Sequence, residues 1–282
     1  MIKRSEKPEK IDSTWNSTAT LPVIAIIISS SYIQNNLGLC EGIEEKLLFT
    51  TPTFVKEIDL NTAVVREIVK QNDEVFSMAY DYKEEYLYIP RRFQGDIVRF
   101  RYPNTQKVIF ETIVAAQNPN GVAFDSVNKH LYYTEHDYDG TIMRCDSDGS
   151  NATTISSERY PYLLTLDIQN RLIFFGQADP NGQVCRLTLD GKDKLVFYRY
   201  STNVYGIKVD LGNKLLYWME YGPGRLQYSW YNGTGIETVV TYNSGHNNRN
   251  IDFNGDTIYF ASSNRIMKTD KKGSFQLLFI QI

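Results

Sequence analysis

The sequence is poor in cysteine, histidine and methionine, and these shortages limit the chemistry available to the chain. Three cysteines, three histidines and five methionines occur among 282 residues. Cys40, Cys145 and Cys185 are far apart and none belongs to a CxxC pair, so neither a zinc site nor a disulfide framework is indicated. Because the number of cysteines is odd, at least one of them is unpaired.

Long hydrophobic runs are also missing. The most apolar stretch, Leu21 to Ile28 (LPVIAIII), is far shorter than the roughly 20 residues that cross a bilayer as a helix. We therefore expect no direct membrane span. The stretch lies in an N-terminal extension, residues 1–36, and has two readings: the apolar core of a secretory signal, or a buried strand.

An excess of either charge is absent as well. Thirty Lys and Arg residues oppose 33 Asp and Glu residues, which gives a formal net charge of -3. Such a chain has no basic field to hold a phosphate backbone, so we expect no nucleic acid partner.

Aromatic residues, in contrast, are abundant. The chain contains 20 Tyr and 14 Phe, and 42% of its residues are hydrophobic. Aromatic rings suit the pleated, half-buried surface of a strand. A chain of this length buries roughly three quarters of its unfolded surface, which is enough for one large domain. We predict an all-β protein.

An internal repeat begins near residue 37. Each copy has a short apolar run ending in Asp, then a turn, then Leu or Ile followed by aromatic residues, as in Gly121 to Thr134 (GVAFDSVNKHLYYT). Aligning the first position of the aromatic pair gives Leu48, Tyr88, Tyr132, Ile173, Tyr217 and Tyr259, at intervals of 40, 44, 41, 44 and 42 residues.

A second marker keeps the same period. Asp148-Gly149, Asp190-Gly191, Asn232-Gly233 and Lys272-Gly273 follow the anchors at a fixed delay. We interpret them as two-residue hairpin turns, because glycine and asparagine tolerate the positive φ that such turns need. Four short strands in each of six repeats of about 42 residues predict a six-bladed β-propeller over residues 37–282.

The combination of an inner strand ending in Asp, a Leu-Tyr-aromatic-Thr strand and an Asp-Gly hairpin resembles the YWTD repeat, the class B repeat of the low-density lipoprotein receptor family. Pro119 to Ile155 follows that pattern closely, and the resemblance covers roughly residues 37 to 282. The tetrads read LLFT, YIPR, YYTE, IFFG, YWME and YFAS, so no copy is an intact YWTD. The Gly-His and Trp-Asp signatures of a WD-repeat propeller are absent.

The repeated aspartates are interpreted as structural and not as a ring of catalytic carboxylates. At a strand end before a turn, an Asp side chain satisfies local backbone N–H groups. The set consists of Asp81, Asp125, Asp167, Asp210 and Asp252.

The first blade needs an inner strand. In the receptor family the C-terminal end of the chain supplies it, but here the repeat assigns Ile282 to the outermost strand of blade six. The first candidate is Gly38 to Glu41 (GLCE), since Glu41 precedes Leu48 by the same seven residues that separate Asp125 from Tyr132. Leu21 to Ile28 is the second candidate.

No catalytic residues, metal ligands or cofactor are predicted. Asp146 to Gly149 looks like a calcium loop, but it lacks the Glu at the far end and the hairpin accounts for it. The enzyme alternative is a calcium-dependent six-bladed hydrolase of the lactonase kind, with Asn120, Asn203 and Asn250 pointing to the axis. The resemblance to YWTD repeats favours a protein that is not an enzyme.

Three N-glycosylation sequons begin at Asn16, Asn151 and Asn232, the last two at predicted outer hairpins. They support an extracellular or secreted glycoprotein.

Propeller loops at one end carry the candidate ligand-binding face. Loops between second and third strands contain Arg91, Arg92, Phe93, Glu135, His136, Tyr138, Asp179, Glu220 and Tyr221; loops into inner strands add Tyr160, Tyr162, Tyr205, His246 and Arg249. Aromatic rings mixed with both signs of charge are typical of protein-binding patches.

The resemblance implies an extracellular protein-binding module of the lipoprotein-receptor-related kind, serving endocytosis or Wnt-type signalling. Its expected partner is an extracellular protein ligand or a neighbouring receptor module. The alternative is a secreted matrix-type interaction protein. Some members of the family release ligands at acidic pH, and His136 and His246 are the candidates for that role.

Overall fold

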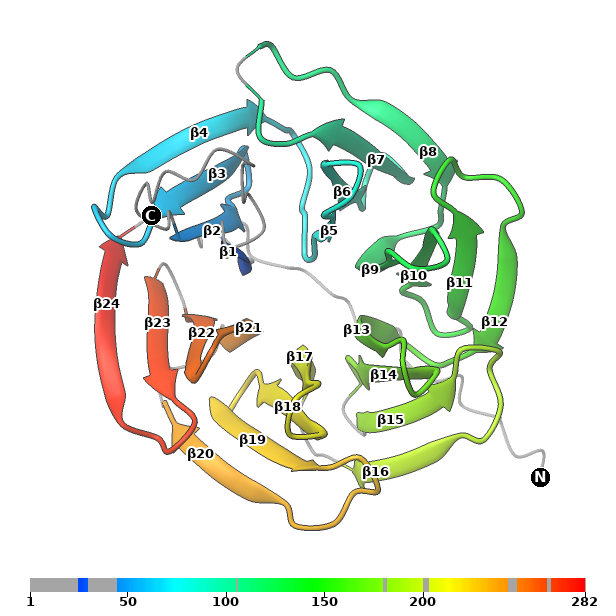
Figure 1. Cartoon of the computed structure of the whole chain (residues 1–282). Helices are drawn as coiled ribbons and strands as arrows, with labels where there is room; N and C mark the ends of the chain where they lie inside the picture. Colours follow the sequence, from blue (N-terminus) through cyan, green and yellow to red (C-terminus); the bar gives the residue numbers. More distant parts are fainter. Residues whose placement is uncertain are drawn as a thin grey trace, which may run out of the picture.

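The computed structural model describes residues 25–29, 45–104, 106–179, 182–199, 203–242, 248–262 and 265–281. Within these ranges, 24 strands form six four-stranded sheets, and no residue is helical. The sheets stand as blades around one axis, with the first strand of each blade innermost and the fourth outermost (Figure 1). The predicted all-β, six-bladed propeller is confirmed.

The blades follow one another in chain order. Blade one contains β1 (Ala25–Ser29), β2 (Glu45–Thr50), β3 (Phe54–Asp59) and β4 (Val65–Lys70). Blade two contains β5 (Ala79–Asp81), β6 (Tyr86–Arg91), β7 (Asp96–Arg101) and β8 (Glu111–Ala115). Blade three contains β9 (Pro119–Asp125), β10 (His130–Glu135), β11 (Thr141–Asp146) and β12 (Thr153–Ser157).

The second half of the ring repeats this arrangement. Blade four contains β13 (Pro161–Asp167), β14 (Leu172–Gln177), β15 (Gln183–Thr188) and β16 (Leu195–Arg199). Blade five contains β17 (Val204–Asp210), β18 (Leu215–Glu220), β19 (Arg225–Trp230) and β20 (Glu237–Thr241). Blade six contains β21 (Asn248–Asn254), β22 (Thr257–Ser262), β23 (Arg265–Asp270) and β24 (Phe275–Gln281).

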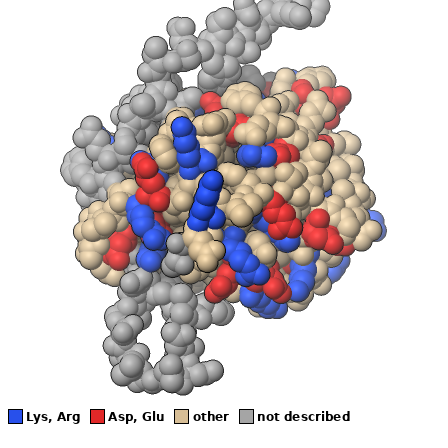
Figure 2. Space-filling model, turned by 90° about the horizontal axis from the view of Figure 1, so that it is seen from above, with Lys and Arg blue, Asp and Glu red and all other residues tan. Residues whose placement is uncertain are grey.

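Burial explains why the inner strands lack an alternating pattern. In β9 and β13 the first four residues are buried, because neighbouring blades cover both faces of the strand. The fourth strands β4 and β12 form the rim and are largely exposed. Lys and Arg are interspersed with Asp and Glu on the side of the molecule that Figure 2 draws, in keeping with the near-neutral composition.

Strand register corrects one repeat anchor. Tyr132 pairs with Ala123 and Tyr217 pairs with Lys208, in each case two residues before the Asp that ends the first strand. In blade four the residue paired at that position, Thr165, faces Phe174 and not Ile173. The predicted anchor Ile173 is therefore one residue out of register. With Phe174 in its place, the intervals become 40, 44, 42, 43 and 42 residues.

The glycine markers do lie in turns between third and fourth strands, but these turns are longer than predicted. Gly149 N–H donates to the Asp146 carbonyl at 2.9 Å, and Asp146 N–H donates to the Ser150 carbonyl at 2.9 Å. Only the glycine has positive φ, +88° at Gly149. This is a three-residue hairpin with a glycine bulge, and it recurs at Gly191, Gly233 and Gly273. The two-residue turn predicted from the sequence is wrong.

These glycines also pack one blade against the one before it. A Cβ atom at Gly149 would lie 1.9 Å from the carbonyl oxygen of Ile113, in the outer strand β8 of blade two. At Gly191 the corresponding distance is 2.0 Å to Ile155, in β12 of blade three. The repeat therefore needs glycine there for close packing as well as for its backbone angle.

Four of the repeated aspartates accept hydrogen bonds from their turns. The carboxylates of Asp81, Asp125, Asp167 and Asp210 each accept from the backbone N–H three residues further on. Asp252 is out of step with them. It pairs with Tyr259 inside the ladder, while Asn254 takes the strand-end position.

Blade one closes with a segment other than the one first expected. The inner strand that pairs with β2 is β1, and its Ile26 faces Leu48. The prediction that Gly38 to Glu41 fills this place is therefore wrong, and those residues lie outside the described ranges. The second candidate, Leu21 to Ile28, overlaps β1. The sheet thus includes residues before the expected boundary at 37, and among the described strands none is shared between blades one and six.

Candidate functional site

Two kinds of connection meet at one end of the propeller, which we call the loop end. They are the loops between second and third strands and the loops from each fourth strand to the next blade. The opposite end, the hairpin end, carries the turns between first and second and between third and fourth strands. All of the predicted ligand-binding residues in the described ranges come from loop-end connections or the strand residues beside them.

Two charged residues of the predicted face stabilise their own loops. Arg91 donates to Asp96, with 2.8 Å between Nε and Oδ1. Glu135 accepts from the backbone N–H of Gln117 and from the hydroxyl of Thr141, both at 2.8 Å. The charged groups of Arg91 and Glu135 therefore make hydrogen bonds within the protein.

Two further acidic residues are paired in the same way. Glu220 is fully buried and lies 2.7 Å from Arg225; burial raises its pKa, and the arginine opposes that rise. Asp179, also buried, lies 2.6 Å from the Nε of Arg159. Both carboxylates are therefore held in ion pairs with arginine side chains of the protein.

Aromatic residues of the predicted face project outward. Phe93 is 72% exposed and Tyr138 is 61% exposed. The Asp73 carboxylate holds the Phe93 backbone N–H at 3.0 Å, and the Arg159 guanidinium lies 4.7 Å from the centre of the Tyr138 ring. Both exposed rings therefore sit on loops that side chains hold in place.

Beneath these loops, one structural position repeats in five blades. It lies five residues before the end of the inner strand and is occupied by Phe76, Asn120, Tyr162, Tyr205 and Arg249. All five side chains are at most 7% exposed. We call this set the axial plug.

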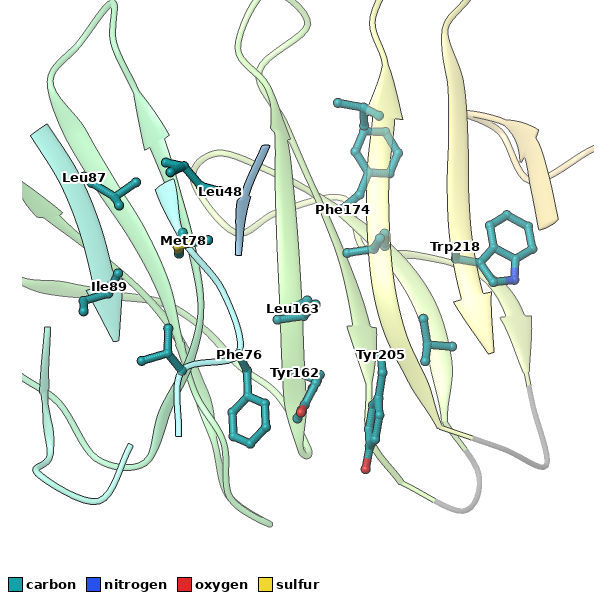
Figure 3. Packing of buried hydrophobic residues seen from close by; sticks show 14 of the residues in the cluster. Leu48, Phe76, Met78, Leu87, Ile89, Tyr162, Leu163, Phe174, Tyr205 and Trp218 are labelled. Carbon is teal, nitrogen blue, oxygen red and sulfur yellow. The ribbon is translucent and has the colours of Figure 1, made fainter. Parts of the chain in front are cut away.

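The rings of the axial plug meet across the axis. The centroids of Phe76 and Tyr162 are 5.7 Å apart, and those of Tyr162 and Tyr205 are 4.3 Å apart and stacked. Figure 3 shows these three rings side by side at one level. Because of the contact between Phe76 and Tyr162, one apolar cluster includes residues of blades one, two, four and five.

Arg249 is the cation of the axial plug. Its guanidinium lies 5.4 Å from the ring centre of Phe76, 5.3 Å from that of Tyr205 and 5.6 Å from that of Tyr221. The side chain is only 4% exposed, and its Nε has no hydrogen-bond partner in the described part of the chain. The aromatic faces stabilise the charge in part, but a buried guanidinium N–H without an acceptor is costly.

Asn120 is the second polar member of the plug and is fully buried. Neither its Nδ2 nor its Oδ1 has a hydrogen-bond partner among the described residues. Two unsatisfied polar side chains thus occupy equivalent positions below the loop end, where buried polar groups are normally paired.

His136 is half-buried against Tyr160 and Tyr162, with ring centroids 5.5 and 5.3 Å away. Burial, followed by the nearby charge of Arg92, lowers the pKa of His136 to about 4. The imidazole is therefore neutral at endosomal pH, which argues against His136 as a trigger of ligand release. His246 lies outside the described residues.

The sequence alone did not single out Phe76 or Arg159. Phe76 lies just before a strand of only three residues, and Arg159 lies in a loop, so neither follows the aromatic repeat. The position five residues before each strand-end Asp was the available signal, and it identifies Phe76, Asn120, Tyr162 and Tyr205 together.

The described residues contain no group of three or more His, Cys, Asp or Glu placed to hold a metal ion. Asn203 donates to the Tyr205 hydroxyl at 3.2 Å, and Asn250 accepts from the Ile251 N–H at 3.0 Å. Cys145 and Cys185 are buried, and burial raises the pKa of the Cys145 thiol to about 12. In the ranges described, no helix is long and apolar enough to cross a membrane.

Comparison with known proteins places this geometry among related propellers. A vitellogenin receptor from Solenopsis invicta is 23% identical over 168 residues, which is 57% of this chain and 9% of the receptor. The match therefore spans a small part of that receptor's length. A chain in a crystal structure of a nidogen–laminin complex superposes with a TM-score of 0.73 at 14% identity, over 83% of this chain and 92% of that one. The predicted resemblance is confirmed.

Other propellers share the fold. A protein from Agrobacterium tumefaciens assigned as TolB superposes with a TM-score of 0.67 at 10% identity, over 81% of this chain and 88% of that one. Hydrazine synthase from Kuenenia stuttgartiensis gives 0.63 at 12% identity, over 80% and 73%. No protein-family model matches the chain. Because one of these propellers belongs to an enzyme, the fold by itself does not decide between binding and catalysis.

Proposed function

We propose that this chain is an extracellular protein-binding module, without enzymatic activity, whose loop end receives a protein ligand or a neighbouring receptor module. The observation that carries the proposal is Arg249, a buried guanidinium with an unsatisfied Nε, enclosed by aromatic rings directly below that end. Arginine and tyrosine in such surroundings are the residues that most often dominate binding energy at protein interfaces.

The exposed part of the loop end supports the same proposal. Phe93 and Tyr138 present large apolar areas to solvent, and their loops are held by Asp73 and Arg159. Aromatic side chains on fixed loops bind a partner with little loss of conformational freedom.

The similarities support a receptor-type or matrix-type role. The vitellogenin receptor match favours a receptor ectodomain, and the structural match to the nidogen–laminin complex favours a secreted matrix protein. In both cases the module binds another protein outside the cell. We favour the receptor-type role, since that match is the one supported by sequence.

The enzyme alternative is a calcium-dependent hydrolase of the lactonase kind. It requires Asn120, Asn203 and Asn250 to share one ion. Asn203 and Asn250 instead make local contacts with Tyr205 and Ile251, so the observations favour binding over this chemistry.

The test is a pull-down of secreted and matrix proteins on the full chain. We expect a specific partner that is lost when Phe93, Tyr138 and Arg249 are changed together to Ala, Ala and Met. The matched control changes Val127 and Leu211 to Ser; these residues are 70% and 57% exposed and lie in turns at the hairpin end.

Loss of the partner in the loop-end variant, with retention in the control, supports the proposal. A partner that survives the loop-end changes contradicts the assignment of the binding face. Calcium-dependent esterase activity in a sample that binds no protein contradicts the whole proposal in favour of the hydrolase.

A further inference from the structure

The third turn of blade five departs from its equivalents. It consists of Trp230, Tyr231, Asn232, Gly233 and Thr234, and it has the same glycine-bulge geometry as the others: Gly233 N–H donates to the Trp230 carbonyl at 2.9 Å, and Trp230 N–H to the Thr234 carbonyl at 3.0 Å. The residue that opens the turn is an indole, 52% exposed.

In four of the other blades the residue at this position is small and polar, and it caps the turn; in blade two it is Arg101. Asp59, Asp146, Thr188 and Asp270 occupy it. The carboxylates of Asp59 and Asp270 and the hydroxyl of Thr188 accept backbone N–H groups of their own turns, and the Asp146 carboxylate accepts from Asn151. Tryptophan has no acceptor for this task. The geometry of the turn therefore does not require a tryptophan at position 230.

Trp230 and Asn232 are both exposed in this turn. Between them, Tyr231 points inward: its ring lies 4.7 Å from that of Phe174 in blade four, and its carbonyl accepts from Arg186 at 3.0 Å. A Cβ at Gly235 would lie 3.0 Å from Cδ1 of Trp230. The indole thus lies back along the turn, and the absence of a side chain at Gly235 makes room for it.

Asn232 opens a sequon, and its side chain is oriented for attachment. Its Oδ1 accepts the Thr234 N–H at 3.1 Å and the Thr234 hydroxyl at 2.8 Å. Both residues are exposed. The Oδ1 atom is therefore fixed to the turn, and Nδ2, the atom that carries an N-linked sugar, belongs to an exposed side chain two residues after Trp230.

We propose that Trp230 is a carbohydrate platform that packs against the first N-acetylglucosamine of an N-linked glycan on Asn232. The apolar C–H face of a pyranose ring is complementary to the flat, electron-rich face of an indole. The proposal rests on the extracellular location in the proposed function, since the modification takes place in the secretory pathway.

The modification itself is a group transfer from a lipid-linked oligosaccharide diphosphate. A bond forms between Nδ2 of Asn232 and C1 of the sugar as the bond from C1 to the diphosphate breaks. The diphosphate leaves with that electron pair, and the amide gives up one proton to the transferase. Only the packing of the attached sugar on Trp230 depends on the folded turn.

Asn151 provides the contrast. Its Nδ2 donates to Asp146 at 2.7 Å, so the atom that would carry a sugar is engaged in the turn. The residue two positions before it is Gly149, which offers no ring. A glycan at Asn151 therefore has no platform, although both sequons are exposed.

The experiment is a thermodynamic cycle on the full chain, in which the sugar at Asn232 and the side chain at position 230 are changed separately and together. The protein is secreted from animal cells and trimmed to a single N-acetylglucosamine per site, and the same chain is made in bacteria without sugar. Each form is prepared with Trp230 and with Trp230→Thr, and Trp230→Leu serves as a second variant that keeps apolar bulk without a ring. Thr18→Val and Thr153→Val remove the Asn16 and Asn151 sequons from all samples, so that only the sugar at Asn232 is compared.

We expect the sugar to raise Tm by about 2 °C or more with Trp230 and to leave Tm unchanged in both variants. Sugar proton resonances are expected to move upfield over the indole and to return in the variants. An equal sugar effect in all three proteins, or an unoccupied Asn232 in secreted protein, overturns the proposal. A glycosylated chain that fails to bind any extracellular protein contradicts the proposed function alone.

Discussion

The guanidinium of Arg249 lies 5.4 Å from the centre of the Phe76 ring, although the two residues belong to blades six and two, with blade one between them. The contact exists because equivalent positions of the inner strands converge on the axis. The contact therefore links the stability of the propeller to ligand binding at its loop end, since the same side chains fill the axis and lie beneath the exposed aromatic loops. The predictions below separate these two roles.

Changing Phe76 to Ala is expected to destabilise the protein by about 3–5 kcal/mol, because it leaves a cavity where rings from several blades meet. The matched control is Phe93→Ala, expected to cost less than about 0.5 kcal/mol because that ring is 72% exposed. Urea unfolding of both variants makes the comparison. Equal effects would show that the axial plug adds little to stability.

Changing Arg249 to Met is expected to leave stability unchanged or to raise it by up to about 2 kcal/mol. Methionine fills similar space among Phe76, Tyr205 and Tyr221 without a buried, unsatisfied donor. Ligand binding at the loop end is expected to fall at least about tenfold. Unfolding and binding are measured on the same preparation. A large loss of stability would assign Arg249 a purely structural role.

Changing Gly149 to Ala is expected to cost about 2–5 kcal/mol. The new methyl group meets the Ile113 carbonyl in the preceding blade, and the residue must also hold a positive φ. Gly255→Ala is the matched control. Its φ is also positive, at +58°, but nothing lies within 4 Å of the added atom, so we expect a loss of only about 1 kcal/mol. If thermal unfolding shows similar losses, contact between blades is not the reason for glycine at position 149.

Acidification from pH 7 to pH 5.5 is expected to remove about 1 kcal/mol of stability through His136. Its pKa is about 4 in the folded protein and about 6.5 when unfolded. The unfolded chain therefore takes up the proton first, and stability falls as the pH drops from about 6.5 toward 4. His136→Phe is expected to reduce this slope in urea unfolding measured at several pH values. An unchanged slope would mean that His136 titrates normally.

The pairing of β1 with β2 in blade one is expected to open more readily than the inner-strand pairing of the other blades. Fifteen residues separate β1 from β2, whereas four separate β9 from β10, so closure of β1 onto its sheet carries the larger entropy cost. Hydrogen exchange is expected to be faster for the amides of Ala25–Ser29 than for those of the equivalent strand Pro161–Asp167. Equal protection would indicate that contact with blade six stabilises β1 fully.

Much of the fold could be predicted from the sequence because the same residue pattern occurs in several copies at a fixed spacing. The aromatic pairs and the glycine markers both gave a period near 42 residues, and together they predicted six blades of four strands. The errors occurred where a single copy had to be interpreted alone. Ile173 and Phe174 are both apolar, so the sequence pattern fits either residue as the anchor. Only the pairing of Thr165 with Phe174 identifies the correct one.

For the predicted binding face, too, the sequence predicts the position of the loops but not the contacts of their side chains. The sequence identified the loops correctly as connections at one end, since strand direction alternates along the chain. It could not distinguish Arg91, which is held by Asp96, from Arg249, which lies among aromatic rings. That difference depends on which side chains from distant blades meet.

By itself, then, the sequence determined the number of blades, the position of the second strands and the need for glycine at the outer hairpins, because these are local patterns repeated at a fixed interval. The tertiary structure decided which segment completes blade one, which polar groups are buried without partners at the axis, and the exposure of Trp230 in the turn that carries Asn232. These features arise from packing between blades and from exceptions within single copies, and a repeating pattern carries no information about its own exceptions.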